Sequence, residues 1–201
     1  MITAAPNAIP GVVSTLTLSP SLFTPPCAVL CRNTAPLIPL AYYLFRHSIP
    51  CAIAGRDLGT SLITLIKKFH APDIPTLLAR LEVWQDKEIA KRNASNRSVE
   101  SVNDQAEAIR FFASAESSVD SIITRITSLF QPSPSPSVIH LSTIHRAKGL
   151  EWPLVFILDW HLIPSRYATS PSALRQERNL QYVAITRSSN ALHYITSPCK
   201  N

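Results

Sequence analysis

The stretch "LSTIHRAKGLEW", residues 141–152, decides the fold, because it links two apolar segments through a strongly polar connection. The run that ends at Leu141 and the run "PLVFILD" at 153–159 both have the composition of buried strands. Between them stand a histidine, two cations, a glycine and a carboxylate. Chains seldom place that much charge between two buried strands unless the connection faces something polar. We therefore expect the connection to form part of a binding site.

Strand and helix patterns alternate on both sides of this stretch. "CAVLC" at 27–31 is predicted to be a buried strand, "PLIPLAYYLFRH" at 36–47 a helix, and "PCAIAG" at 50–55 a second strand. A helix over 172–188 and a strand over 191–196 are predicted near the end of the chain. Strand, helix and strand in so few residues indicate a βαβ unit, so the sequence predicts an α/β fold with a parallel sheet.

The middle of the chain has a different period. Between Asp57 and Phe130 the apolar residues recur at helical spacing and never alternate as they would in a strand. This pattern predicts a small all-helical insertion in the α/β framework. The polar stretch "NASNRSVESVND" inside it is predicted to be a loop, with Asn103 or Asp104 as the cap of the next helix.

These patterns divide the chain into four parts. Residues 1–26, rich in proline, are expected to form an irregular lead-in, and 57–130 the helical insertion. The sheet domain would comprise 27–56 and 138–201. The proline and serine run at 131–137 is predicted to be an extended linker, with a docking motif for a proline-binding domain as the alternative.

Composition limits the classes of partner. The net charge of +6 and the pI near 9.4 favour a polyanionic partner, although a solvated basic surface gives the same numbers. The four cysteines form no C-x-x-C pair, so we interpret them as small buried hydrophobes rather than as a zinc site. Reduced cysteines and the lack of a long apolar run predict a soluble, cytoplasmic protein with no membrane span.

Two groups of polar residues are candidates for chemistry. The loop after Leu141 leaves the carboxyl end of a strand, where open α/β sheets place their ligands, although a merely solvated connection is the alternative. The helix "QERNLQYVAITR" at 176–187 would present Arg187 at its end. A guanidinium there suits a phosphate, because its planar fork makes several charge-assisted bonds, but it could equally cap the helix.

Three segments together resemble a known family. "LSTIHRAKGLEWPLVFILD" and "QERNLQYVAITRS" closely resemble motifs V and VI of the UvrD/Rep-type superfamily 1 DNA helicases, and "CAVLCRNTAPLIPLAYYLFRHSIPCAIAGRD" resembles their motif IV region. The resemblance implies a second RecA-like domain, which in those helicases forms one wall of the ATP cleft and half of the single-stranded DNA track. The partner would be single-stranded or partly duplex DNA.

The resemblance also implies roles for individual residues. Arg32 and Arg187 would be the motif IV and motif VI arginines near the γ-phosphate, Gly149 and Glu151 would approach the ATP ribose, and Thr143 and His145 would face DNA. Arginines so placed stabilise charge on a transferring phosphoryl group. We expect Arg32, Glu151 and Arg187 to converge on one rim of the sheet.

The sequence departs from the family in one respect that affects activity. It contains no G-x-x-x-x-G-K-[ST] phosphate loop, and "FILDW" supplies a single Asp159 where a Walker B site needs an acidic pair. ATP with Mg would therefore be held mainly by a P-loop-bearing first RecA-like domain, in cis or in trans, so we do not expect an autonomous ATPase. A non-catalytic nucleic-acid-binding module is the alternative, and an unrelated flavodoxin-like fold is a third.

Overall fold

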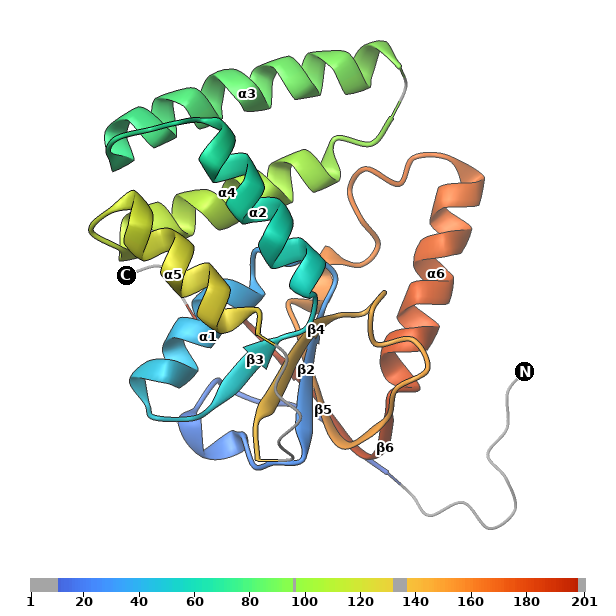
Figure 1. Ribbon diagram of the computed structural model, residues 1–201. Helices are drawn as coiled ribbons and strands as arrows, with labels where there is room; N and C mark the ends of the chain where they lie inside the picture. The colour runs from blue at the N-terminus through green and yellow to red at the C-terminus, as the bar shows by residue number, and fades with distance from the viewer. Residues whose placement is uncertain (1–10, 96, 132–136, 199–201) are drawn as a thin grey trace.

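The computed structural model describes residues 11–95, 97–131 and 137–198 (Figure 1). Over these residues it contains one six-stranded sheet in the order β1-β6-β5-β2-β4-β3, and every neighbouring pair of strands is parallel. The strands are β1 Val12–Thr15, β2 Cys27–Cys31, β3 Cys51–Ile53, β4 Ile139–Thr143, β5 Trp152–Leu158 and β6 Ser188–Ile195. The predicted RecA-like α/β fold is confirmed.

Six α-helices and two short 3-10 helices accompany the sheet in the described part of the chain. The helices are α1 Leu37–Arg46, α2 Arg56–Lys68, α3 Ile74–Ala94, α4 Glu100–Ala115, α5 Val119–Leu129 and α6 Pro171–Ile185, with 3-10 turns at Pro20–Leu22 and Trp160–Leu162. Helices α1 to α5 gather on one side of the sheet, whereas α6 lies on the other (Figure 1). Both faces of the central strands are therefore covered, as a parallel sheet requires.

Strand β2 shows how the sequence supports this two-sided burial. All five of its residues are fully buried, and they alternate between the two cores. Cys27, Val29 and Cys31 face the core shared with the insertion, and Ala28 and Leu30 face the core under α6. Burial raises the pKa of both cysteine thiols to about 12, so they remain protonated. They pack as small hydrophobes, which confirms that prediction; Cys199 lies outside the described residues.

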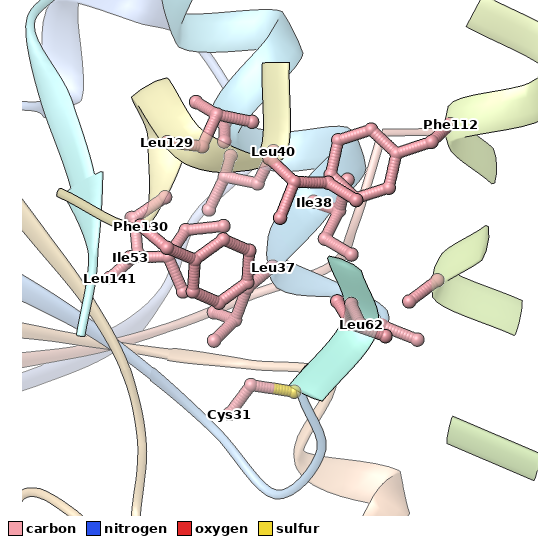
Figure 2. Close-up of a cluster of buried hydrophobic side chains, with 14 of the residues drawn as sticks. Cys31, Leu37, Ile38, Leu40, Ile53, Leu62, Phe112, Leu129, Phe130 and Leu141 are labelled. Atoms are coloured by element: carbon pink, nitrogen blue, oxygen red, sulfur yellow. The ribbon is translucent and has the colours of Figure 1, made fainter. Parts of the chain in front are cut away.

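The helical insertion shares its core with the sheet. Figure 2 shows Leu62 of α2, Phe112 of α4 and Leu129 of α5 pointing into the same cluster as Leu37 of α1 and Leu141 of β4. Gly59 of α2 is part of this packing, because a Cβ there would lie 2.7 Å from Cβ of Phe130. The insertion therefore buries its apolar stripes directly against the α/β framework.

The predicted cap of α4 is wrong. The helix begins at Glu100, so Asn103 and Asp104 lie inside its first two turns. The carboxylate of Asp104 instead accepts hydrogen bonds from the backbone N–H groups of Thr34 and Ala35, just before α1, at 3.0 and 2.7 Å. A local cap preference was visible in the sequence, but the N–H groups that Asp104 satisfies lie about seventy positions away.

The prediction that residues 1–26 form an irregular lead-in is also wrong in part. Val12–Thr15 forms the edge strand β1, paired in register with Ala191–Tyr194 of β6. Val12 and Val13 are both exposed, at 57% and 65%, so no alternation of buried and solvated residues marked this strand in the sequence. Residues 1–10 lie outside the described residues, as do 132–136 of the predicted linker.

The strand register defines two edges of the sheet. At the carboxyl edge, Cys31 of β2 lies opposite Thr143 of β4 and Leu158 of β5. At the amino edge, Trp152 lies opposite Ser188. Because β4 ends at the first edge and β5 begins at the second, residues 144–151 run back along the sheet.

No helix among the described residues combines the length and the apolar character that crossing a bilayer would demand.

Candidate functional site

Arg32 lies at the carboxyl edge, directly after β2, and is held in a double ion pair. Its Nε and one terminal nitrogen donate to the carboxylate of Glu177 on α6, the latter at 2.8 Å, and the same nitrogen donates to Glu100 on α4 at 3.0 Å. Side-chain exposure is 13% for Arg32 and 8% for Glu177, so the Arg32–Glu177 pair is largely removed from solvent. The charge of Arg32 is therefore matched inside the protein.

The carboxylates of this pair also hold a loop in place. Glu177 accepts the backbone N–H of Ser165 at 3.0 Å, and Glu100 accepts the Ser165 hydroxyl at 2.8 Å. Burial by itself would raise the pKa of Glu177, but the hydrogen bonds from Arg32 and from the Ser165 N–H, with the charge of Arg32, lower it below its ordinary value. Four segments distant in sequence thus meet at one charged cluster: the end of β2, α4, the loop at Ser165, and α6.

A pocket of about 350 Å³ opens beside this cluster. Thr143, the last residue of β4, lines it together with His145 and Arg32. Desolvation and then the nearby guanidinium of Arg32 lower the pKa of His145, so its ring is neutral at pH 7. Asn33 also lines the pocket, and its buried Oδ1 has no hydrogen-bond partner among the described residues.

Arg146 closes one side of this pocket. It forms an ion pair with Asp57 in the first turn of α2, which lowers the pKa of that carboxyl. Gly55 lies immediately before α2 with φ of 124°, and a Cβ there would come within 3.2 Å of Nε of Arg146. The side chain of Arg146 therefore lies against the first turn of α2, where the insertion begins.

Arg187 lies at the opposite, amino edge, between α6 and β6. Its Nε donates to the carbonyl of Val183 at 3.0 Å, and its two terminal nitrogens donate to the carbonyl of Leu150 at 2.8 Å and to Oγ1 of Thr186 at 2.9 Å. None of these acceptors carries a charge. The bond to Val183 matches the predicted alternative of a helix-capping arginine. The bond to Leu150 goes further, because it ties Arg187 to the segment before β5.

That segment carries two more predicted site residues. Gly149 has φ of 85°, a conformation that favours glycine, and no atom lies within 4 Å of the position of a Cβ there. Glu151 is exposed and directly precedes β5. The backbone N–H of Trp152 donates to the carbonyl of Arg187 at 2.9 Å. Gly149, Glu151 and Arg187 are thus brought together on one accessible surface.

The predicted convergence of Arg32, Glu151 and Arg187 on one rim is wrong. Arg32 follows the carboxyl end of β2, whereas Glu151 and Arg187 precede β5 and β6, so they are separated by the length of a strand, on the order of 20 Å. The error arose because the whole connection after Leu141 was assigned to the edge where β4 ends. Only the tertiary structure shows that the connection crosses to the other edge.

Two functional residues of the charged cluster escaped prediction. Glu177 carried a signal, because it shares a helical stripe with Leu180 and Ala184 and so places a carboxylate on a buried face. Such a carboxylate needs a cation, and Arg32 was available. Glu100 carried no signal, since it stands in a polar stretch. Within the described residues, no three side chains of metal-ligand type gather into a group that could hold a metal ion.

Comparison with known proteins gives one family. The model of the UvrD-like helicase C-terminal domain matches residues 76–198, which is more than half of the chain. The match starts in α3, so it does not include β2 and Arg32.

Curated relatives match over a shorter stretch. The chain is 42% identical over 65 residues to ATP-dependent DNA helicase UvrD1 of Mycobacterium leprae, which is 31% of this chain and 8% of the relative. It is 45% identical over 65 residues to DNA helicase II of Haemophilus influenzae, 31% of this chain and 9% of the relative. Against ATP-dependent DNA helicase PcrA of Bacillus subtilis it is 40% identical over 70 residues, 33% and 9% respectively. The aligned stretches thus span less than a tenth of each relative's length.

Proposed function

Since the chain belongs to the UvrD-like helicase C-terminal domain family, we propose that it acts as the second RecA-like domain of an ATP-dependent DNA motor. Its amino edge would cover a nucleotide held by a P-loop domain, and its carboxyl edge would carry single-stranded DNA. One observation supports this division above others: of the two arginines predicted near the nucleotide, only Arg187 has no carboxylate partner in the part of the chain that the structure describes.

Arg187 has the geometry of an arginine finger. A guanidinium has five N–H donors, and three are used on Val183, Leu150 and Thr186, so two remain for phosphate oxygens. The two carbonyls fix the position of the group before the nucleotide arrives, and a preorganised cation stabilises negative charge on a transferring phosphoryl group. Glu151 would accept from the ribose hydroxyls, and the lack of a side chain at Gly149 leaves room for the sugar.

Arg32 receives a different role in this proposal. Its guanidinium donates to two carboxylates and its charge is neutralised, so it positions α6 rather than contacting phosphate. This assignment replaces its predicted role as a second γ-phosphate arginine.

The carboxyl edge is proposed as the DNA contact. Thr143 and His145 line the pocket there. A neutral His145 ring suits stacking on a base or a hydrogen bond to it better than ion pairing with phosphate. A protein that acts on DNA would work inside the cell, and the cytoplasm is its proposed location.

The chain would not hydrolyse ATP by itself. The sequence has no P-loop lysine or paired Walker B acids, so the partner domain must hold ATP with Mg. Bound ATP supplies the phosphoryl group whose transfer drives the motor. The acceptor of that group is water. The contribution of this chain is to deliver the guanidinium of Arg187 and to hold the DNA.

A mixing experiment tests the proposal. The full chain is combined with a purified P-loop-bearing first RecA-like domain from a UvrD-type helicase and single-stranded DNA, and phosphate release is measured. We expect DNA-dependent turnover that Arg187→Ala abolishes and that Arg178→Ala, an exposed arginine on the same helix, leaves intact. Turnover that survives Arg187→Ala would refute the arginine finger. DNA binding without any turnover would favour a non-catalytic nucleic-acid-binding module.

A further inference from the structure

A second groove lies within the helical insertion, between α2, α3 and α4. It has a volume of about 820 Å³. Side chains of α2 form most of its wall, Trp84 of α3 and Gln105 of α4 complete it, and the α2 residues are Arg56, Asp57, Thr60, Ser61, Thr64, Leu65 and Lys68. Arg56 and Asp57 end the segment that resembles motif IV, but no residue that lines the groove was assigned a role by that resemblance, so the groove has no role in the proposed function so far.

The charge of the groove favours an anion. Arg56, Thr60, Thr64 and Lys68 recur every four residues and are all exposed, so they form one stripe along α2. The stripe is about 18 Å long and has a cation at each end. Asp57, the one acidic residue of the wall, is already paired with Arg146. The hydroxyl of Ser61 accepts from Gln105 at 3.2 Å and keeps its own proton for a phosphate oxygen.

The opposite wall offers a flat apolar surface. Trp84 is half-buried, and its ring is held edge-on by Phe69, with centroids 6.3 Å apart and planes at 65°. Trp84 and the half-buried Leu65 line the groove together. The hydroxyls of Thr60 and Thr64 donate to backbone carbonyls of α2, so the two cations and Ser61 are the groups left for phosphate. A fixed indole face beside these cations matches what single-stranded nucleic acid requires, namely base stacking along a positively charged backbone track.

The groove adjoins the carboxyl edge of the sheet. Arg146 lines the pocket that contains Thr143 and His145, and its ion-pair partner Asp57 lines the groove. Arg56 lies next to Asp57 at the near end of the stripe. A strand that leaves the first pocket past Arg146 would therefore enter the groove at Arg56 and continue toward Lys68.

We propose that this groove is a second single-stranded DNA site, with phosphates on Arg56 and Lys68 and a base stacked on Trp84. The inference rests on the proposed function, because it extends the DNA path that begins at Thr143 and His145. The compact insertion would then have a function, because its helices would bind the DNA where it leaves the sheet.

Binding of a fluorescent oligothymidylate to the full chain tests the charge requirement. The variant Arg56→Glu/Lys68→Glu should weaken binding more than tenfold, and the slope of log affinity against log salt should fall by about 1.4, since each phosphate contact on a single strand contributes about 0.7. The matched control is Lys87→Glu/Lys91→Glu on α3, outside the groove, which changes the net charge equally and should weaken binding less than threefold. Equal losses in the two variants would overturn the proposal.

Photo-cross-linking tests the position of the strand independently of charge. Oligothymidylate that carries 5-iodouracil should cross-link to the peptide containing Trp84, and Trp84→Leu should remove that product while circular dichroism shows a folded chain. Cross-links confined to the Thr143–His145 segment would overturn the groove and leave the carboxyl-edge site standing. No DNA binding by the wild-type chain would also overturn it, whereas ATP turnover that depends on Arg187 is measured separately and would still support the proposed function.

Discussion

The arginines at the two edges of the sheet have different hydrogen-bond partners. At the carboxyl edge, Arg32 donates to two carboxylates and is largely buried. At the amino edge, Arg187 donates to two backbone carbonyls and a hydroxyl, and no carboxylate among the described residues matches its charge. Both residues occur in segments that resemble helicase motifs, so the motif by itself does not fix the role. An arginine whose guanidinium is paired with carboxylates stabilises the fold. One that donates only to neutral acceptors keeps its charge for an anionic ligand.

Helix α6 connects these two edges. Glu177 in its middle binds Arg32, and Arg187 follows its last turn ten residues later, a distance of about 15 Å along the helix. The charged cluster at the carboxyl edge therefore anchors the helix that carries Arg187. The comparison predicts that substitutions at one edge change stability and those at the other change turnover.

The largest expected effect is at the amino edge. Arg187→Ala should lower ATP turnover with the P-loop partner domain by about 10³-fold or more, because the arginine would no longer stabilise the transition state. The affinity for single-stranded DNA should not change. Phosphate release and fluorescence anisotropy measure the two quantities. Loss of both ATP turnover and DNA affinity in this variant would contradict separate roles for the two edges.

The next effect is on stability at the carboxyl edge. Arg32→Met should reduce the free energy of unfolding by about 3 kcal/mol, because it leaves Glu177 buried without its cation. Urea unfolding followed by circular dichroism measures it. Arg178→Met, an exposed arginine on α6, is the control and should stay within about 0.5 kcal/mol of the wild type.

A double variant sharpens that result. Arg32→Met combined with Glu177→Leu should cost less than the sum of the two single variants by more than about 1 kcal/mol, because the second change removes the unpaired charge. Additive costs would show that Arg32 and Glu177 do not stabilise the fold as a pair.

The pH dependence of stability should report the same pair. The pKa of Glu177 in the folded chain is below the ordinary value of 4.5, so the folded state binds this proton less readily than the unfolded state. The stabilisation is complete above pH 4.5 and is lost as the pH falls through the folded-state pKa. Urea unfolding at a series of acidic pH values should show a shallower decline for Arg32→Met than for the wild type. Parallel declines would rule out the pair as its source.

The smallest effect concerns DNA at the carboxyl edge. His145→Ala should weaken binding of single-stranded DNA about fivefold, consistent with the loss of one stacking contact. Because the ring is neutral at pH 7, the salt dependence of binding should keep its slope. A reduced slope would mean that His145 binds phosphate as a cation.

Local patterns in the sequence predicted most of the elements. Apolar runs such as "CAVLC" identified the buried strands. The first helix of the insertion was identified by apolar residues three or four positions apart, at Leu58, Leu62, Leu65 and Phe69. Strand β1 was missed, because Val12 and Val13 are both exposed and the strand exists only through its pairing with β6. Elements that are stabilised by their own periodic burial are visible in sequence, and those stabilised by a partner are not.

The candidate site was also predicted only in part. The sequence identified five candidate residues through the resemblance of their segments to helicase motifs V and VI: Thr143, His145, Gly149, Glu151 and Arg187. Their distribution between two edges was not predicted, and neither was the burial of Arg32 between Glu100 and Glu177. Both depend on where the connection after β4 travels and on which carboxylates the insertion brings back to the sheet.

The sequence by itself determined most of the strands, the helices and the family, because these follow from periodic burial and from short motifs that neighbouring residues carry together. The tertiary structure decided which arginine keeps a free charge. That outcome depends on contacts between residues 68 and 145 positions apart in the chain, and no local pattern encodes which charges will meet once the chain has folded.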